Sequence, residues 1–162
     1  MKITPWVMTP DKFMKVYNEQ LREDLLHVSD EGRNPGAVFS GLMRVFDPNG
    51  PHEIFELDGC GILVFRDIAD GFKCQMSFII WDKKCYGADI VREARQLIAD
   101  FSKRRGLVKI ETQTADERVV RLARMLLFEI EGYRVDSFLR GKEKYGVTLL
   151  GRSFQEEDIC AI

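Results

Sequence analysis

The chain has 162 residues, 45% hydrophobic and 31% charged, which is typical of one globular domain with a substantial core. Its formal net charge of −2 gives no electrostatic basis for binding nucleic acid or an acidic membrane surface. No apolar run approaches the roughly 20 residues of a membrane-spanning helix. The first residues lack the apolar core of a signal peptide, so we expect a cytoplasmic protein.

The cysteines predict neither a metal site nor a disulfide framework. Cys60, Cys74, Cys85 and Cys160 include no CxxC pair, and only two histidines accompany them. A chain this large and apolar does not need disulfides for stability. We therefore expect reduced and mostly buried thiols.

The first part of the chain predicts a short strand and two helices. Residues 1–8 are expected to form the strand. Residues 9–11 (Thr-Pro-Asp) are a helix start, with a hydroxyl at the N-cap, a proline at the first helical position and an acid in the first turn. Apolar residues then recur at helical spacing as far as Val28. A turn-rich loop at 29–36 precedes a shorter helix over 37–46.

After the Pro- and Gly-containing turn at 47–51, the pattern changes to that of strands. Three strands are expected, over 53–57, 61–66 and 72–81. The turns between them are short, and the first is an Asp-Gly pair at 58–59. This pattern predicts an antiparallel meander.

A helix is expected to follow Gly87 and to run to Arg105, where basic residues and Gly106 end it. Such a strand-to-helix corner can bind an anion, because the first turn of a helix offers unpaired N–H groups and the positive end of its dipole. A further strand is expected over 107–113.

The last part of the chain predicts a helix and a hairpin. Thr114-x-x-Glu117 has the spacing of a capping box, and Gly132 is the expected end of the helix. A hairpin over 133–150 follows. We expect a single domain over residues 1–152, with 153–162 as a C-terminal tail.

This order of elements, with a glycine loop after the fourth strand, resembles the GNAT acetyltransferase superfamily over residues 1–152. The most specific part is Glu129-Ile-Glu-Gly-Tyr133, which is similar to the family's helix end, where a glycine and an aromatic residue open the sixth strand. The resemblance implies a mixed α/β fold. Strands one to four would be antiparallel, strands four and five would splay apart, helices would flank the sheet and a C-terminal hairpin would complete it.

The resemblance also implies acetyl-CoA as the cofactor, bound in the gap between strands four and five. The fourth-strand backbone that would pair with its pantetheine arm is Phe78, Ile79, Ile80 and Trp81. The loop residues that would bind its pyrophosphate are Lys84, Tyr86, Gly87, Ala88 and Asp89. In the family this loop reads Arg/Gln-x-x-Gly-x-Gly/Ala, so Lys84 stands in for the first cation and Gly87 matches.

Asp89 departs from the family pattern, because it replaces the last small residue. One interpretation is that its carboxylate repels a pyrophosphate and competes with it for the same N–H groups. The other interpretation is that Asp89 is the N-cap of the helix.

The catalytic residues match the family only in part. Its frequent general acid is a tyrosine at the position that is Phe128 here, and phenylalanine cannot donate a proton. Tyr133 or Tyr145 would then have to supply the acid. Each of these tyrosines also fits an ordinary strand residue.

The general base should be a carboxylate or a histidine near the gap between the strands. Glu111, on the fifth strand, is our candidate, although it also fits an ordinary polar position on an alternating strand. Glu56 and Asp58 are looser alternatives.

The resemblance and the departures from it leave three functions open. The first is an acetyl-CoA-dependent N-acyltransferase acting on a small-molecule or protein amine. The second is a catalytically degenerate GNAT-like protein that binds a partner or joins an assembly, such as a phage virion component. The third is an unrelated α+β binding domain.

Overall fold

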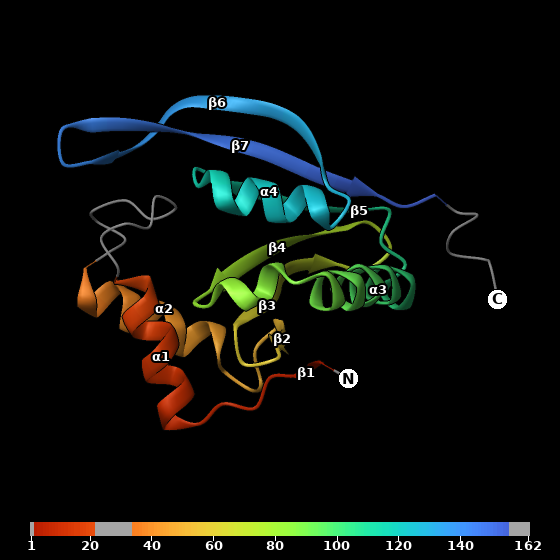
Figure 1. The fold of residues 1–162 in the computed structure, drawn as a ribbon, viewed down its shortest axis with the longest axis horizontal. Coiled ribbons are helices and arrows are strands. Elements are labelled where there is room, and N and C mark those ends of the chain that lie inside the picture. Colours follow the sequence, from red (N-terminus) through yellow and green to blue (C-terminus); the bar gives the residue numbers. More distant parts are fainter. Residues whose placement is uncertain (1, 22–33, 156–162) are drawn as a thin grey trace.

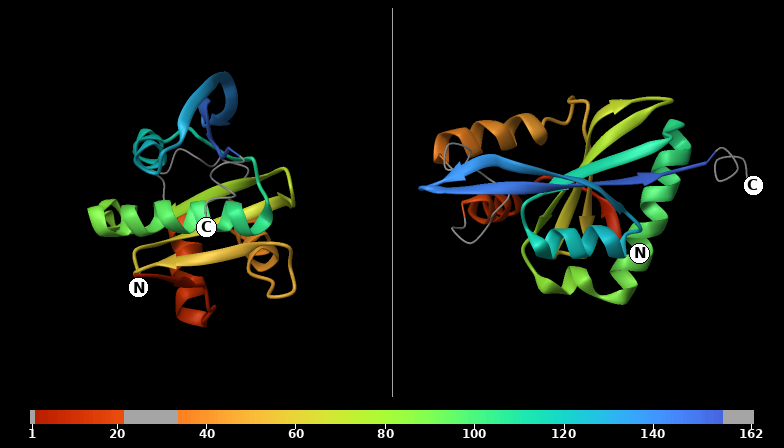
Figure 2. Two further views of the ribbon diagram at one scale, coloured as in Figure 1. Left: turned by 90° about the vertical axis from the view of Figure 1, so that its right-hand side faces the viewer. Right: turned by 90° about the horizontal axis from the view of Figure 1, so that it is seen from above.

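The computed structural model describes residues 2–21 and 34–155, which form one seven-stranded sheet with helices against both faces (Figures 1 and 2). The strands are β1 (Ile3–Pro5), β2 (Glu53–Leu57), β3 (Gly61–Ala69), β4 (Lys73–Ile80), β5 (Lys109–Thr114), β6 (Glu129–Arg140) and β7 (Glu143–Ser153). The helices are α1 (Pro10–Gln20), α2 (Pro35–Val45), the 3-10 helix η1 (Lys83–Tyr86), α3 (Ala88–Arg105) and α4 (Glu117–Met125). This is the mixed α/β architecture that the sequence implied.

The strand order is β1-β2-β3-β4-β5-β7-β6. Strands β1 to β4 pair antiparallel with their neighbours, which confirms the predicted meander. Strand β5 is parallel to β4, and the hairpin β6–β7 adds to its far side through an antiparallel β5–β7 pairing. In Figure 1 this hairpin runs past α4 toward the end of the molecule where α1 and α2 lie.

Each face of the sheet has its own core, because neighbouring residues along a strand point to opposite faces. Alternate residues of β3, such as Leu63 and Phe65, pack with α3 and α4 in the larger core. The residues between them, Ile62 and Val64, pack with α1 and α2 in the smaller core. Among the described residues, no helix is both long and apolar enough to cross a membrane.

Several helix ends lie where the sequence placed them. The Thr9 side chain accepts a hydrogen bond from the Lys12 backbone at the start of α1, at 3.3 Å. Gly106 ends α3 with a φ of 63°, in the left-handed region that favours glycine. Helix α2 begins two residues earlier than expected, after Asn34 as N-cap. The expected continuation of α1 to Val28 lies outside the described residues.

The expected start and end of α4 were wrong. Asp116, not Thr114, is the N-cap, and Thr114 belongs to β5. The chain leaves the helix through Leu127, which has a φ of 69°, and not through Gly132. The stretch Glu129–Tyr133 therefore lies inside β6. The helix ends earlier than predicted because Leu127, and not Gly132, adopts the left-handed conformation.

The C-terminal strand is longer than expected. Strand β7 runs to Ser153, and the Phe154 N–H donates to the Val108 carbonyl at 2.9 Å. The phenyl ring of Phe154 packs against the larger core. The first residues of the expected tail thus belong to the sheet.

The prediction of reduced cysteines was wrong for two of them. Cys60 and Cys85 form a disulfide, with their Cα atoms 5.6 Å apart, and it links the turn before β3 to η1. Cys74 is free and buried, and burial raises the pKa of its thiol to about 12. Cys160 lies outside the described residues. Sequence spacing missed the pair because 25 residues separate its members and only the fold brings them together.

Candidate functional site

Strands β4 and β5 pair over three residues and then part. Lys73, Cys74 and Gln75 lie opposite Lys109, Ile110 and Glu111. Beyond Gln75, β4 continues to Ile80 beside β3, and no described strand pairs with its other edge. The expected splayed pair is confirmed, and it leaves unpaired N–H and C=O groups along one edge of β4.

A hollow of about 160 Å³ lies where the two strands have separated. Its walls come from the end of β4, the following loop and η1, the start of α4 and the end of α1. The lining residues are Glu19, Gln20, Phe78, Ile79, Ile80, Trp81, Asp82, Lys83, Tyr86, Asp116, Arg118 and Val119. All four residues predicted from the fourth strand are therefore at the hollow.

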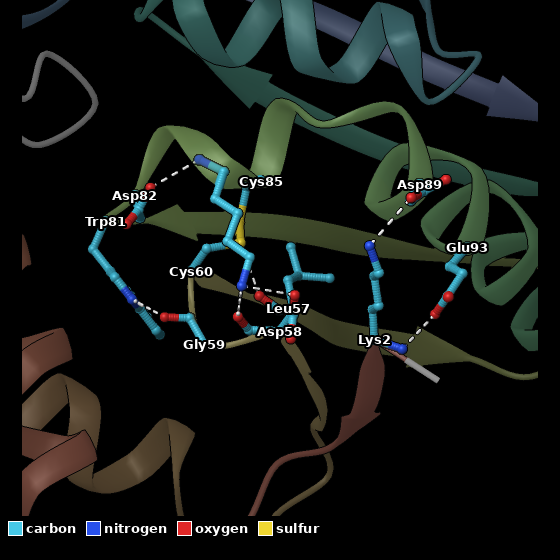
Figure 3. Close-up of polar contacts among 11 residues, drawn as sticks. Lys2, Leu57, Asp58, Gly59, Cys60, Trp81, Asp82, Cys85, Asp89 and Glu93 are labelled. Carbon is cyan, nitrogen blue, oxygen red and sulfur yellow. Dashed lines mark hydrogen bonds and ion pairs between the residues drawn. A yellow bond between two sulfur atoms is a disulfide. The ribbon is translucent and has the colours of Figure 1, made fainter.

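The end of β4 is held from both faces of the sheet. Phe78 is buried in the core beneath α3 and α4, whereas Ile79 and Trp81 pack against the core beneath α1 and α2. The Trp81 indole N–H donates to the Gly59 carbonyl at 2.7 Å (Figure 3). These contacts fix the backbone of 78–81 although no described strand pairs with its open side.

Lys84 is tied to the turn between β2 and β3 and does not line the hollow. Its ammonium lies 2.8 Å from the Asp58 carboxylate and also donates to the Asp58 carbonyl at 3.3 Å. The hydrogen bond from Lys84 lowers the pKa of Asp58. Lys83 lines the hollow, whereas Lys84, the predicted cation of this loop, does not.

Helix α3 begins at Ala88, with Gly87 as its N-cap, and no described side chain caps it. The first N–H groups of α3 are therefore left for another acceptor, and the positive end of the helix dipole lies there. A Cβ at Gly87 would lie 3.1 Å from the Lys84 carbonyl oxygen, so the turn is tight at this residue. This corner is suited to an anion such as a phosphate.

Asp89 is not the N-cap, so that interpretation was wrong. Its carboxylate lies 3.2 Å from the Lys2 ammonium and 3.0 Å from the Arg92 guanidinium, and Figure 3 shows it directed toward Lys2. The hydrogen bond from Lys2, with the charges of Lys2 and Arg92, lowers the pKa of Asp89. The Lys2 backbone N–H also donates to Glu93 at 2.8 Å. Two cations thus offset the carboxylate at this helix start.

No family model and no curated protein matches the chain by sequence. Solved structures do match it. A GNAT-family acetyltransferase from Bacillus anthracis aligns with a TM-score of 0.68 and 14% identity, covering 94% of this chain and 95% of that one. A spermidine N-acetyltransferase from Vibrio cholerae, in complex with CoA and spermine, aligns with a TM-score of 0.69 and 16% identity, covering 98% of each chain. The chain has the GNAT fold.

Within this GNAT fold, Tyr86 is the tyrosine at the hollow; Tyr133 and Tyr145, the two considered as acids, do not line it. Burial raises the pKa of Tyr86, and the negative charge of Asp116 raises it further. The phenol therefore stays protonated at neutral pH and can donate a proton. Tyr86 was proposed from the sequence for the cofactor loop and was not considered as a proton donor.

Glu111 lies on the α1–α2 face of the sheet and does not line the hollow. Its carboxylate accepts from Gln75 at 2.7 Å and from Lys73 at 3.3 Å, and lies 3.6 Å from the Lys109 ammonium. Partial burial raises the pKa of Glu111, but the hydrogen bonds from Lys73 and Gln75 and the charges of Lys73 and Lys109 outweigh it. The pKa of Glu111 therefore lies below its ordinary value. A base that works near neutral pH needs the opposite shift.

The structure does not bring Tyr133 to Glu111. Tyr133 pairs with Thr148, and Thr148 with Thr114, which places Tyr133 on the sheet face opposite Glu111. The Tyr133 side chain is 64% exposed. Tyr145 donates from its hydroxyl to Glu143 at 2.5 Å in the hairpin.

The looser base candidates are also engaged elsewhere. Glu56 forms an ion pair with Lys12, and Asp58 holds Lys84. Neither carboxylate lines the hollow.

Sequence reasoning missed Asp116 and Arg118, which line the hollow from the start of α4. Asp116 is only 4% exposed; its carboxylate accepts from the Arg118 backbone at 2.8 Å and lies 2.8 Å from the Arg118 guanidinium. An aspartate two residues after a strand, directly before an apolar helical stripe, is an N-cap signal that could have found it.

Proposed function

We propose that this protein is an acetyl-CoA-dependent N-acyltransferase acting on an amine. The observation that carries the proposal is the backbone of residues 78–81, which borders a hollow where β4 has left β5 and leads to the uncapped start of α3. The spermidine N-acetyltransferase with the similar fold binds CoA and spermine, which supports both the cofactor and an amine acceptor.

Acetyl-CoA, when bound, would supply a thioester whose carbonyl carbon an amine attacks, and CoA would leave as a thiol. The unpaired edge of β4 would hold the pantetheine arm through its peptide groups. One of its N–H groups would donate to the thioester oxygen as negative charge develops there. The first N–H groups of α3 at Ala88 and Asp89 would bind the pyrophosphate. Tyr86, protonated at neutral pH, would donate a proton to the leaving sulfur.

The acceptor ammonium must lose a proton before its nitrogen can attack. The lowered pKa of Glu111 and its position outside the hollow speak against Glu111 as the base. Glu19 lines the hollow from the end of α1, and we place the base there. Acetylation would otherwise consist mainly of positioning the amine against the thioester.

A binding or structural protein without catalysis is the second candidate. Phe128, at the position of the family's frequent acid, is only 2% exposed and belongs to the larger core. Such a protein could serve in an assembly such as a phage virion. The cytoplasmic location expected from the N-terminal sequence stays a prediction, and the Cys60–Cys85 disulfide argues against it, because disulfides persist mainly in oxidising compartments.

Thermal unfolding with CoA and with acetyl-CoA tests the proposal. A ligand at about 100 times its Kd adds about 2.7 kcal/mol to the free energy of unfolding, so a clear rise in Tm is expected. Gly87→Glu should abolish the rise, because the new carboxylate occupies the helix start. Gln96→Glu adds the same charge to an exposed site further along α3 and should leave the rise intact.

If neither ligand changes the Tm of the wild-type protein, the acyltransferase proposal is wrong. If CoA binds but no acetyl group is transferred to any amine in a broad panel, the second candidate holds.

A further inference from the structure

A second hollow, of about 370 Å³, lies beside the first on the face that α2 covers. The two hollows share Gln20, Phe78 and Ile79. Phe78 and Ile79 belong to the stretch of β4 that has left β5. The second hollow therefore reaches the same backbone from the α2 side, where a molecule other than the cofactor can approach it.

The walls of this second hollow are mostly apolar. The apolar residues that line it are Ala37, Val38, Leu42, Val45, Val64, Phe78 and Ile79. Among the described residues that line it, Arg66 is the one charged side chain and none is acidic. A ligand here would bury an apolar body and place a polar group near the guanidinium.

Arg66 is held in place at this hollow. Its Nε–H donates to the Ser77 hydroxyl at 3.1 Å, and its Nη1 lies 2.9 Å from the Asp67 carboxylate. The Asp67 side chain is 65% exposed, and an ion pair as exposed as this one contributes little. A carboxylate from a ligand can therefore compete with Asp67 for the guanidinium, which binds carboxylates through paired N–H donors.

Gln20 offers a second donor where the two hollows meet. Its amide Nε2 is buried and has no hydrogen-bond partner among the described residues. A buried amide without a partner is unfavourable unless a bound molecule supplies an acceptor. Both polar features of this region thus favour a ligand that carries hydrogen-bond acceptors.

We propose that the second hollow binds the acceptor, and that the acceptor is a small amine with an apolar body and a carboxylate, such as an α-amino acid with an apolar side chain. This proposal rests on the function proposed above. A polyamine carries several positive charges, which Arg66 would repel and which no described carboxylate of this hollow would offset. In the reaction, the amine nitrogen bonds to the acetyl carbon, the carbon–sulfur bond breaks, and the proton lost by the amine balances the one gained by the CoA sulfur.

The release of CoA thiol from acetyl-CoA, measured with L-leucine, isopentylamine and spermidine, tests this proposal. Isopentylamine is leucine without its carboxylate, so the ratio of kcat/KM for the two isolates that group. The wild-type protein should favour leucine over both other amines. Arg66→Gln should lower kcat/KM for leucine by about tenfold, mainly through KM, and leave isopentylamine nearly unchanged. Arg44→Gln, an exposed arginine of α2 outside both hollows, should alter neither value.

Titration of the CoA-free protein with N-acetyl-L-leucine and with N-isopentylacetamide separates this proposal from the proposed function. Tighter binding of N-acetyl-L-leucine, lost in Arg66→Gln, supports the acceptor class even if no acetyl transfer occurs. Efficient acetylation of spermidine, or an equal loss for all acceptors in Arg66→Gln, overturns the acceptor class and leaves the acyltransferase proposal standing. Equal or absent binding of the two acetylated compounds also overturns it.

Discussion

Gln75 and Glu111 form the last aligned pair between β4 and β5, and the Gln75 amide donates to the Glu111 carboxylate at 2.7 Å. Lys73 and Lys109 approach the same carboxylate from the two strands. This cluster fastens the strands directly before they part. Glu111 therefore supports the site by its position and lies outside the hollow in which the chemistry is proposed to occur.

We expect Glu111→Gln to lower the free energy of unfolding at pH 7 by about 1 kcal/mol, because it removes charge-assisted hydrogen bonds at a partly exposed site. The folded-state pKa of Glu111 lies below its ordinary value of 4.5. The Glu111 carboxylate thus contributes fully to the free energy of unfolding above pH 4.5. This contribution is lost as the pH falls through the lower pKa of the folded state. Urea unfolding of both proteins between pH 7 and pH 3 measures the difference, which should shrink only below about pH 4.5.

Glu129→Gln is the matched control, because Glu129 is exposed at the start of β6 and should change stability little. If Glu111→Gln instead removes the acidic limb of the kcat/KM profile and leaves stability unchanged, Glu111 is the base after all.

We expect Asp89→Asn to raise the affinity for CoA by about two- to fivefold at low salt, because it removes a negative charge from the first turn of α3. It also releases Lys2 and Arg92, both of which now pair with Asp89. The gain should shrink as salt is added. Calorimetric titration with CoA measures it, and Lys2→Gln should change affinity in the opposite direction. An affinity that does not respond to either substitution would show that the phosphates bind elsewhere.

We expect Tyr86→Phe to lower kcat by about 100-fold or more while leaving CoA binding nearly unchanged, because a general acid acts on the reaction and little on binding. The pKa of Tyr86 is raised, so the wild-type rate should hold up to a pH above the ordinary tyrosine value of 10 before the donor is lost. Steady-state rates as a function of pH check both points. Tyr133→Phe, at an exposed site, should have no such effect, and an equal loss in that variant would contradict the assignment.

We expect Cys60→Ser to lower the free energy of unfolding by about 3 kcal/mol, since the Cys60–Cys85 bond closes a loop of 25 residues in the unfolded chain. Thiol titration of the denatured protein, with and without prior reduction, counts the bonded cysteines. Cys74→Ser keeps the Cys60–Cys85 bond, so reductant should lower the stability of this variant as it does that of the wild-type protein, whereas the stability of Cys60→Ser should not depend on reductant. A wild-type protein that is equally stable with and without reductant would show that the bond does not form.

The sequence predicted those parts of the fold that local chemistry decides. Thr9 and Gly106 mark helix ends because a hydroxyl satisfies free N–H groups and glycine adopts positive φ without strain. The sequence-based prediction was wrong where two residues could each end the same helix. Gly132 was a reasonable helix end, but Leu127 takes the left-handed position and Gly132 lies in β6.

The candidate site, too, could be predicted from the sequence only in part. Phe78 to Trp81 could be placed at the hollow because they end an apolar strand, and the glycine corner follows directly in the chain. The sequence could not predict the roles of residues whose partners lie far away in the chain. Lys84 forms an ion pair with Asp58, Asp89 forms one with Lys2, and Cys85 is bonded to Cys60. The spacing of these residues in the sequence does not indicate the pairs.

By itself the sequence determined the order of the elements and the strand whose end carries the site, since hydrophobic periodicity and turn residues act over a few neighbouring positions. Only the tertiary structure decided which side chains meet. It turned Glu111 away from the hollow and placed Tyr86 and Asp116 along it. The physical reason is that contacts between distant segments depend on sheet register and on the parting of two strands, and both are set by packing across the whole fold.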